Sequence, residues 1–268
     1  FEVTLCGNTI MTHLALAVST QAIAVVPFTP AFTHSLELRA RELGFRLHPQ
    51  ARAYVLPCVA GYVGGDITGG MVATDLEKRE VPTLFVDIGT NGEVVLARDG
   101  QVLACSSPAG PAFEGARISC GSRAIRGAID RLAYDPDARD LCFHVIGDTP
   151  PHGICGTGLI DAGALFLAQG LLDPTGLIVD PAEAKAKLPP KLAARVGPGP
   201  GGSQILLAPP AETLDGRRSL VLTQRDIREL QLAKGALRAG VDMALREWGL
   251  QGAQLDRVLI ACGFGNFI

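Results

Sequence analysis

Residues able to hold a phosphate group and a cation lie together in the segment 84–96. An apolar run ends at Asp87, and a turn through Gly89, Thr90, Asn91 and Gly92 leads into a second apolar run. The N–H groups of a glycine-rich turn and a threonine hydroxyl can donate to phosphate oxygens, and an aspartate at a strand end can hold a hydrated Mg²⁺. The pattern predicts a phosphate-binding β-hairpin, although a hairpin in which Asp87 only caps the turn fits it equally well.

Other glycine-rich turns follow predicted strands or begin predicted helices. The N–H groups at the start of a helix have no partner within the helix, so such turns suit an anion or another ligand. An ordinary helix cap or a tight strand exit explains the same residues. The candidate ligand-facing residues at these turns are Gly7, Asn8, Thr9, Asp66, Gly156, Thr157, Gly263, Phe264 and Gly265.

One further carboxylate stands in a rigid loop at residues 106–116, which contains two prolines and two glycines around Glu114. A carboxylate held there can lie near phosphates or an attacking water. A solvated acid near a helix start is an equally good interpretation. His152, beside two prolines, is interpreted as a loop histidine, and Cys155 as a buried thiol.

Composition excludes several classes of protein. The chain has 268 residues, 47% of them hydrophobic, which predicts one large globular unit or two fused ones. A net charge of −3 argues against a nucleic-acid-binding surface. Seven cysteines without a CxxC pair indicate reduced thiols of a cytoplasmic protein. Residues 3–36 carry no Asp, Glu, Lys or Arg, but their polar residues and prolines argue against a membrane span.

The coarse element pattern is that of an α/β protein. A three-stranded antiparallel meander is predicted over 84–105, with Asp99 and Gly100 forming its second turn. Thr223 and Asp226 form the ends of a capping box for a long helix that ends at Gly249. Strands are predicted at 2–6, 54–56, 141–146 and 257–261, helices at 10–17, 35–43, 68–76, 118–132 and 159–168, and a surface loop at 181–210.

Taken together, these motifs resemble the actin/Hsp70/sugar-kinase ATPase superfamily, whose two ribonuclease-H-like halves each open with a phosphate-binding hairpin. More narrowly, the chain resembles the C-terminal domain of the ATP-dependent reductive activators of corrinoid proteins. The resemblance spans essentially the whole chain and rests on residues 6–14, 63–66, 87–93, 109–116, 153–161 and 263–266.

The resemblance implies an ATPase fold in which residues 1–80 end a first lobe and residues 81–268 form a second lobe that is incomplete at its C-terminus. Asp87 would hold Mg²⁺ through water, residues 89–92 would cradle phosphate, and Glu114 would lie near the γ-phosphate or the partner. Residues 263–265 would face the adenosine, and the loops of Asn8 and Asp66 would line the cleft.

The activity that the resemblance implies is the coupling of ATP to the reduction of a Co(II) corrinoid to Co(I). Members of the family act on a corrinoid protein or a corrinoid-dependent methyltransferase and take the electron from an iron–sulfur cluster in a separate segment. That segment and the first phosphate hairpin are expected outside this sequence, so this piece alone is expected to be inactive. A homodimer is compatible with the resemblance. The alternatives are a sugar or acetate kinase on the same scaffold and a scaffold that binds partners without nucleotide.

Overall fold

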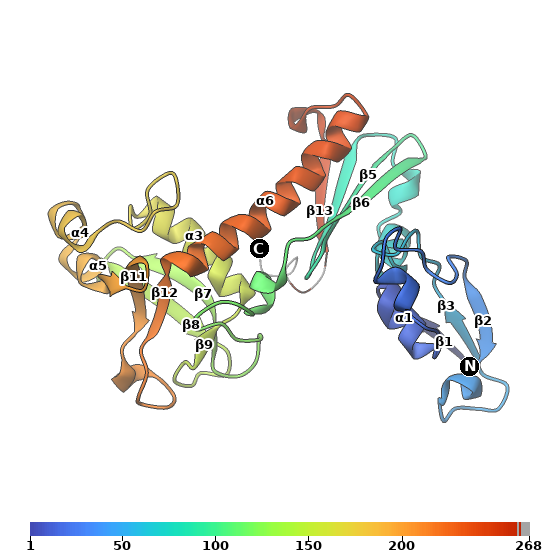
Figure 1. Cartoon of the computed structure of the whole chain (residues 1–268), viewed down its shortest axis with the longest axis horizontal. Helices are drawn as coiled ribbons and strands as arrows, with labels where there is room; N and C mark the ends of the chain where they lie inside the picture. The colour runs from blue at the N-terminus through green and yellow to red at the C-terminus, as the bar shows by residue number, and fades with distance from the viewer. Residues whose placement is uncertain (262, 264–268) are drawn as a thin grey trace. The chain divides into compact units, whose positions relative to one another are not determined.

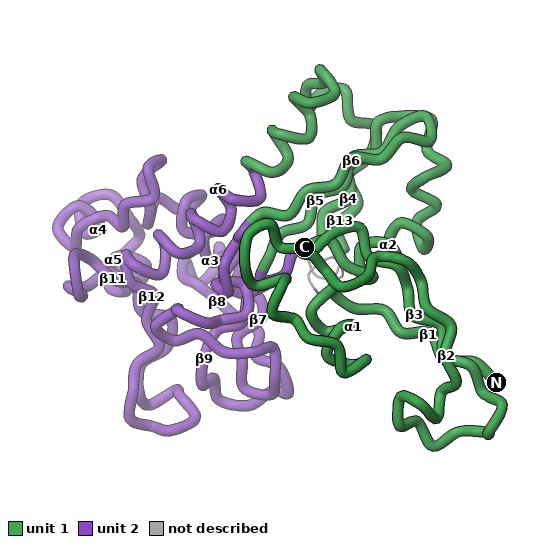
Figure 2. The backbone as a smooth tube through the Cα atoms, turned by 45° about the vertical axis from the view of Figure 1, so that its right-hand side comes forward, with its two compact units in different colours: residues 1–87, 91–107, 239–261 green, residues 88–90, 108–238, 262–268 purple. Residues whose placement is uncertain are grey.

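The structure is a computed structural model that describes residues 1–261 and residue 263 (Figure 1). The chain forms two compact units, which are coloured separately in Figure 2. Unit 1 comprises Phe1–Asp87, Asn91–Ser107 and Ala239–Ala261, whereas unit 2 comprises Ile88–Thr90, Pro108–Arg238 and the described residue Gly263. No helix in the described part of the chain combines the length and the apolar composition that a membrane span needs.

Unit 1 contains a three-stranded sheet with the order β1-β3-β2. Strand β1 pairs in parallel with β3, and β2 pairs antiparallel with β3. The sheet is accompanied by two helices that begin at glycine-rich turns, as the sequence predicts. The elements are β1 (Glu2–Leu5), α1 (Thr9–Ala15), β2 (Leu36–Arg39), β3 (Arg52–Val55) and α2 (Gly65–Ala73).

The helix predicted at 35–43 is wrong. Residues 36–39 form β2, and a short 3₁₀ helix, Ala40–Leu43, follows it. Pairing with β3, in which Leu38 lies opposite Ala53, supplies backbone hydrogen bonds that outweigh the local helical pattern. Gly44 does end the segment as predicted, with a φ of 80° that a glycine adopts without strain.

The second sheet of unit 1 confirms the predicted meander and has the strand order β13-β4-β5-β6. Strands β13 and β4 are parallel, with Ala261 opposite Asp87, so Asp87 lies at the carboxyl end of two parallel strands. In open α/β sheets this is the edge at which ligands bind. The strands are β4 (Thr83–Ile88), β5 (Gly92–Arg98), β6 (Gln101–Ser107) and β13 (Arg257–Ala261).

One face of this sheet is buried in the core of unit 1. Phe85, Val95 and Ala97 pack with Val63 and Ile67 in a single hydrophobic cluster, which positions the strand ends firmly. Burial of the larger side chains of this cluster, those of Phe, Val and Ile, contributes about 1.5–3 kcal/mol each.

The turn between β5 and β6 has the conformation that its sequence predicts. Asp99 and Gly100 both have positive φ, at 52° and 74°. Two positive φ values in succession are typical of a type I′ hairpin turn, which matches the twist of the flanking strands.

Unit 2 contains two further sheets, with the strand orders β8-β7-β9 and β10-β11-β12. Helix α3 packs against β7. The long helix α6 has residues in both units. The elements are β7 (Ala128–Asp135), β8 (Asp140–Val145), β9 (Gly153–Ile154), α3 (Gly156–Ala168), α4 (Pro181–Lys187), α5 (Pro190–Arg195), β10 (Val196–Gly199), β11 (Gly202–Ala208), β12 (Leu220–Thr223) and α6 (Gln224–Glu247).

Two predictions for unit 2 are wrong. The helix predicted over 118–132 is replaced by turns and by the start of β7, because pairing with β8 and β9 requires an extended backbone. The surface loop predicted over 181–210 contains α4, α5, β10 and β11. Asp180 caps α4 through the N–H groups of Ala182 and Glu183, and prolines occupy the first positions of both helices. Proline suits that position because its missing N–H would have no partner there anyway.

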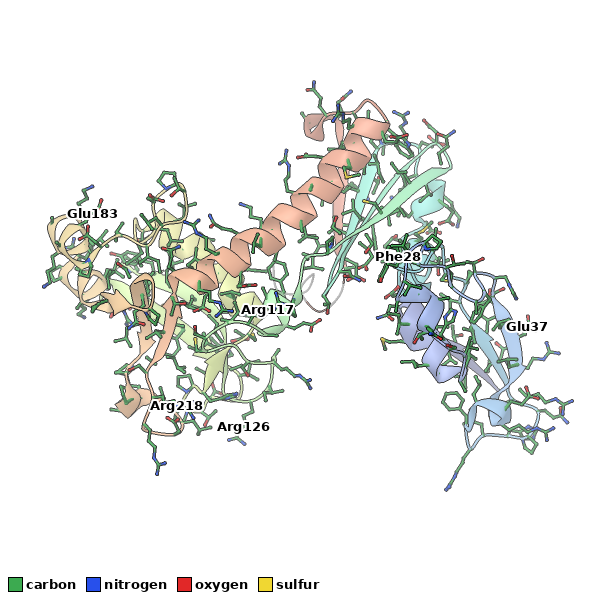
Figure 3. The ribbon with its side chains drawn as sticks, in the orientation of Figure 1. Phe28, Glu37, Arg117, Arg126, Glu183 and Arg218 are labelled. Atoms are coloured by element: carbon green, nitrogen blue, oxygen red, sulfur yellow. The ribbon has the colours of Figure 1, made fainter. Side chains whose placement is uncertain are left out.

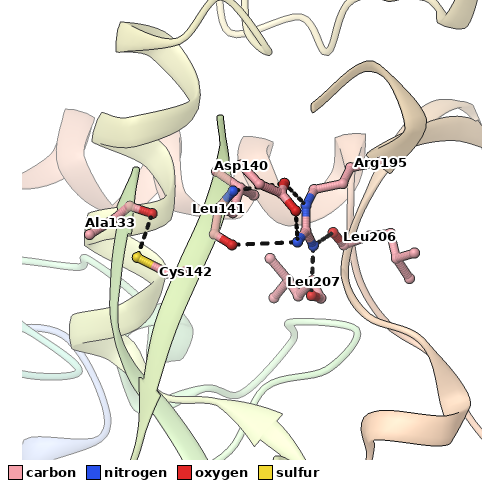
Figure 4. A network of polar contacts seen from close by, with 7 residues as sticks. All are labelled: Ala133, Asp140, Leu141, Cys142, Arg195, Leu206 and Leu207. Carbon is pink, nitrogen blue, oxygen red and sulfur yellow. Dashed lines mark hydrogen bonds and ion pairs between the residues drawn. The ribbon is translucent and has the colours of Figure 1, made fainter. Parts of the chain in front are cut away.

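A single arginine joins three elements of unit 2 (Figure 4). Arg195, at the end of α5, donates from Nε to Asp140 Oδ1 at 2.6 Å and from Nη2 to Asp140 Oδ2 at 2.9 Å. Its Nη1 donates to the carbonyl oxygens of Leu206 and Leu207 in β11 at 3.1 and 2.9 Å. The hydrogen bond from Arg195 lowers the pKa of Asp140. This bidentate pair fixes α5 and β8 against β11.

The predicted capping box at the start of α6 is confirmed. The N–H of Thr223 donates to Asp226 Oδ2 at 2.7 Å, and the N–H of Asp226 donates to Thr223 Oγ1 at 3.3 Å. Asp226 is fully buried, and its Oδ1 also accepts from the N–H of Ser119 at 2.7 Å. The same carboxylate therefore caps the helix and anchors the loop before β7.

Candidate functional site

The hairpin at the centre of the predicted site forms, with a connection of three residues. Strand β4 ends at Ile88 and β5 begins at Gly92, so residues 89–91 make the turn and Gly92 already belongs to a strand. The sequence pattern had placed all four residues 89–92 in the turn. Asp87 therefore immediately precedes the last residue of β4.

The tip of the hairpin is tied to the loop that carries Glu114. The N–H of Gly110 donates to the carbonyl oxygen of Thr90 at 2.9 Å. The hydroxyl of Thr90 donates to Oε1 of Glu114, the last residue of a short 3₁₀ helix, Pro111–Glu114. Both Thr90 and Glu114 are exposed, so this polar pair is open to a ligand. The structure thus brings together two residues that the sequence analysis named separately.

Unit 1 gathers three carboxylates around the strand ends. Asp66 lies in the first turn of α2, Asp87 in β4, and Glu93 in β5 opposite Ser106. Burial raises the pKa of Glu93 to about 7, with further contributions from the negative charges of Asp87 and Asp66. Burial also raises the pKa of Asp66. A site that holds like charges this close is stabilised by a cation.

The donor chemistry of this group fits a hydrated Mg²⁺. Carboxylate oxygens are the ligands that Mg²⁺ prefers, and this ion usually keeps several of its waters. Within residues 1–261 and 263, no three His, Cys, Asp or Glu side chains are arranged to coordinate a metal ion directly. The role of Asp87 in holding the ion through water stays a prediction. Glu93 was not among the predicted site residues, although it directly follows Gly92, the first residue of β5.

Gly7, Asn8 and Thr9 lie beside Asp66. The side chain of Asn8 caps α1 by accepting from the N–H of Met11 at 2.9 Å, and the Thr9 hydroxyl donates to the carbonyl oxygen of Ala60 at 2.8 Å. The carbonyl oxygen of Gly7 accepts from the N–H of Asp66 at 3.2 Å. Their described contacts are those of a helix cap and of loop packing, which was the alternative interpretation of this turn.

Unit 2 contains a cavity of about 430 Å³. It brings together four predicted site residues: Glu114, Gly156, Thr157 and Gly263. Phe264 and Gly265, also predicted for the site, lie outside the described residues. The remaining walls come from elements that the sequence did not connect with a site, and the residues concerned are Phe113, Ser122, Arg123, Ala124, Asp130, Ile146 and Cys155.

The wall around Gly156 is built by backbone pairing. The N–H of Cys155 donates to the carbonyl oxygen of Ile129 at 3.0 Å, and the N–H of Ser122 donates to that of Ile154 at 2.8 Å. These bonds hold the start of α3 beside β7, so the first N–H groups of a 13-residue helix lie at the cavity. The partial positive charge at a helix start suits a phosphate or another anion. Cys155 is buried, as its interpretation as a structural thiol requires.

Several charged side chains lie on the surfaces of the two units and pair with oppositely charged neighbours. Charged side chains such as Glu37 and Arg218 extend into solvent from their own units (Figure 3). Arg218 lies 3.6 Å from Asp215, and Arg52 lies 2.8 Å from Glu37. Such exposed pairs contribute about 0–1 kcal/mol each.

Comparison with known proteins identifies the family. The model of the C-terminal domain of RACo, the ASKHA domain, matches residues 81–268, and the model of the RACo middle region matches residues 1–79. The chain belongs to the RACo family. The expected actin/Hsp70/sugar-kinase type of fold is confirmed, and the resemblance to reductive activators is confirmed with it.

Individual relatives agree with this membership. A solved structure described as a reductive activator for corrinoid, iron–sulfur protein superposes with a TM-score of 0.84 at 39% identity, over 99% of this chain and 41% of that one. The corrinoid activation enzyme RamQ of Eubacterium limosum is 29% identical over 268 residues, which are 100% of this chain and 44% of the relative.

A third relative is the [Co(II) methylated amine-specific corrinoid protein] reductase of Methanosarcina barkeri, which is 28% identical over 235 residues. The match covers 80% of this chain and 38% of the relative. The chain therefore spans less than half the length of the relatives it matches.

Proposed function

We propose that the chain is the ATP-binding and ATP-hydrolysing module of a reductive activator of corrinoid proteins. The observation that carries the proposal is the bond between the Thr90 hydroxyl and Glu114. This bond joins the tip of a phosphate-type hairpin to a residue that lines the cavity in unit 2. A nucleotide would contact the hairpin with its phosphates and the cavity with its nucleoside, so the two places must be connected.

The proposal gives roles to the predicted residues of the hairpin, of the start of α3 and at Gly263. Asp87 holds Mg²⁺ through water, and the bound ion would neutralise charge that develops on the phosphates. The N–H groups of residues 89–92 and the Thr90 hydroxyl donate to phosphate oxygens. Gly156 and Thr157 present the positive end of α3 to the nucleotide, and Gly263 lets the nucleoside approach bare backbone. Residues 1–80 end the first lobe, and residues 81–268 form the second.

In the proposed mechanism, Glu114 exchanges its hydrogen-bond partner when ATP binds. In the structure, the Glu114 carboxylate accepts a hydrogen bond from the Thr90 hydroxyl. A phosphate oxygen is a stronger acceptor for the Thr90 hydroxyl because it carries more negative charge. Once released, Glu114 can accept a hydrogen bond from the attacking water and orient it.

The whole protein would use this module to drive a one-electron reduction of a Co(II) corrinoid to Co(I). The electron would come from an iron–sulfur cluster in a segment outside this sequence. The printed descriptions of the relatives, which name corrinoid activation and a Co(II) corrinoid protein reductase, support this proposal. Binding and hydrolysis of ATP would supply the free energy by favouring one arrangement of the lobes over another.

The test uses the full-length protein. Calorimetric titration with ATP and Mg²⁺ should give saturable heat, and phosphate release should rise when an oxidised corrinoid protein is added. The absence of heat would favour a scaffold that binds no nucleotide. ATP consumption stimulated by a small polyol, with no response to the corrinoid protein, would favour a kinase. Either result contradicts the proposal.

A further inference from the structure

The cavity of unit 2 has a buried carboxylate in its wall that no predicted role explains. Asp130 lines the cavity and is 7% exposed. Burying a carboxylate is unfavourable because the group loses its hydration, so we expect polar or charged groups beside it that offset this cost. Apart from this residue, β7 presents the apolar residues Ala128, Ile129 and Leu132 to the core.

Asp130 points inward because β7 is irregular at this position. The pairing of β7 with β8 shifts register between Ile129, which lies opposite Val145, and Arg131, which lies opposite His144. Asp130 is therefore the extra residue of a β-bulge. Bulges re-aim single side chains and are over-represented beside active sites.

A histidine holds the carboxylate in place. Oδ1 of Asp130 lies 2.5 Å from Nδ1 of His144 on the neighbouring strand β8. The side chain of Asp130 is 9% exposed and that of His144 is 52% exposed, so the histidine reaches the carboxylate from the solvent side. An ionised carboxylate can only accept, so Nδ1 carries the hydrogen in this bond. The carboxylate keeps further acceptor sites for a ligand.

We infer that Asp130 recognises the ribose hydroxyls of the nucleotide and that His144 positions it. This inference rests on the proposed function, because it takes ATP as the ligand of the cavity. A carboxylate that lines a nucleoside cavity needs donors, and the two hydroxyls of a ribose supply a neighbouring pair of them. An acidic side chain that accepts from a ribose hydroxyl is a recurring solution in dinucleotide-binding folds. The apolar walls beside Asp130, from Phe113 and Ile146, suit the flat faces of the nucleoside.

Binding of ATP and of 2′,3′-dideoxyATP to the full-length protein, measured by calorimetry, tests the inference. The wild type should prefer ATP by about tenfold, because only ATP carries ribose hydroxyls that can donate to the charged carboxylate of Asp130. Asp130→Asn keeps one neutral acceptor in place of two charged oxygens, so it should reduce the preference by lowering the affinity for ATP and not that for 2′,3′-dideoxyATP. Asp137→Asn, in the exposed turn between β7 and β8, is the matched control and should keep the preference.

A second variant covers the case in which the buried Asp130→Asn change prevents folding. His144→Ala removes a half-exposed side chain and should reduce the preference for the ribose without changing the affinity for 2′,3′-dideoxyATP. Equal binding of the two nucleotides by the wild type would overturn the inference. It would also fail if Asp130→Asn kept the full preference for ATP. A wild type that binds neither nucleotide would contradict the proposed function itself.

Discussion

The carboxylates of the two units are held in opposite ways. In unit 1, Asp66, Asp87 and Glu93 act on one another as like charges, and the pKa of Glu93 rises to about 7. In unit 2, Asp130 and Glu114 each accept a hydrogen bond from a nearby side chain. Repelling carboxylates favour a cation, whereas paired carboxylates with spare acceptor sites favour neutral donors. Under the proposed function, this difference predicts that the cation binds in unit 1 and the nucleoside in unit 2.

The largest expected effect comes from the carboxylate at the end of β4. Asp87→Ala should abolish Mg²⁺-dependent hydrolysis in the full-length protein, because it removes the oxygens that hold the hydrated ion. Phosphate release across a Mg²⁺ titration is the measurement, and circular dichroism should show an intact fold. Asp256→Ala, an exposed change just before β13, is the control. Unchanged turnover in Asp87→Ala would show that this residue is not part of the site and would contradict a cation site in unit 1.

The hairpin tip gives the next effect. Thr90→Val keeps the shape of the side chain and removes its hydroxyl, so ATP binding should weaken by about 1–3 kcal/mol if a hydrogen bond to a charged phosphate is lost. Thr90→Ser retains a hydroxyl and should bind ATP nearly as well as the wild type. The dissociation constants of the two variants provide the comparison. Equal affinity of Thr90→Val and wild type would favour a hairpin with only a structural role.

The smallest expected effect is on stability and depends on pH. Folded protein holds the proton of Glu93 up to about pH 7, whereas an unfolded chain releases it near the ordinary value of 4.5. The folded state is therefore favoured at low pH, and stability falls as the pH rises through this window. Glu93→Gln should remove that fall, which we expect to be about 1–2 kcal/mol because solvent screens a half-buried group.

Thermal unfolding at pH 5 and pH 8 measures the effect of Glu93→Gln. The exposed change Glu80→Gln is the control and should follow the wild type at both values. Added Mg²⁺ should also flatten the pH dependence of the wild type, since a cation offsets the repulsion among the three carboxylates. An identical pH dependence in Glu93→Gln and wild type would contradict the proposed repulsion.

The sequence patterns correctly predicted the elements whose conformation is decided by their own residues. The meander of β4, β5 and β6, the Asp99-Gly100 turn, the capping box of α6 and the helix α3 are all confirmed. In each case a strong turn or cap residue lies next to a clear hydrophobic period. Two failures have a different cause: residues 36–39 and 128–132 form strands because other strands pair with them. The third failure, at 181–210, is local, since Asp180 and the prolines that begin α4 and α5 were not recognised as helix starts.

The site residues divide in the same way into those that local sequence patterns indicate and those that only the fold reveals. The residue types at 87–92 and around Glu114 allow a phosphate site, but a capped hairpin turn and a solvated acid explain them equally well, and only the joint pattern of all the motifs favours the phosphate site. Their assignment to catalysis stays a prediction. Asp130 could not be found from the sequence, because a single acid within an apolar strand gives no sign of the bulge that aims it. Glu93 was equally hidden, since its raised pKa depends on burial and on Asp66, which lies 27 residues before it.

The sequence by itself determined the chemistry available to this protein: an acid, a glycine-rich turn with a hydroxyl, and helices that begin at glycine. Tertiary structure alone decided which of these groups share a cavity and which carboxylates repel or pair. The physical reason is the separation along the chain over which each kind of interaction acts. Turns, caps and hydrophobic periods act over a few residues, whereas burial, strand pairing and electrostatic interaction join residues that only the fold brings together.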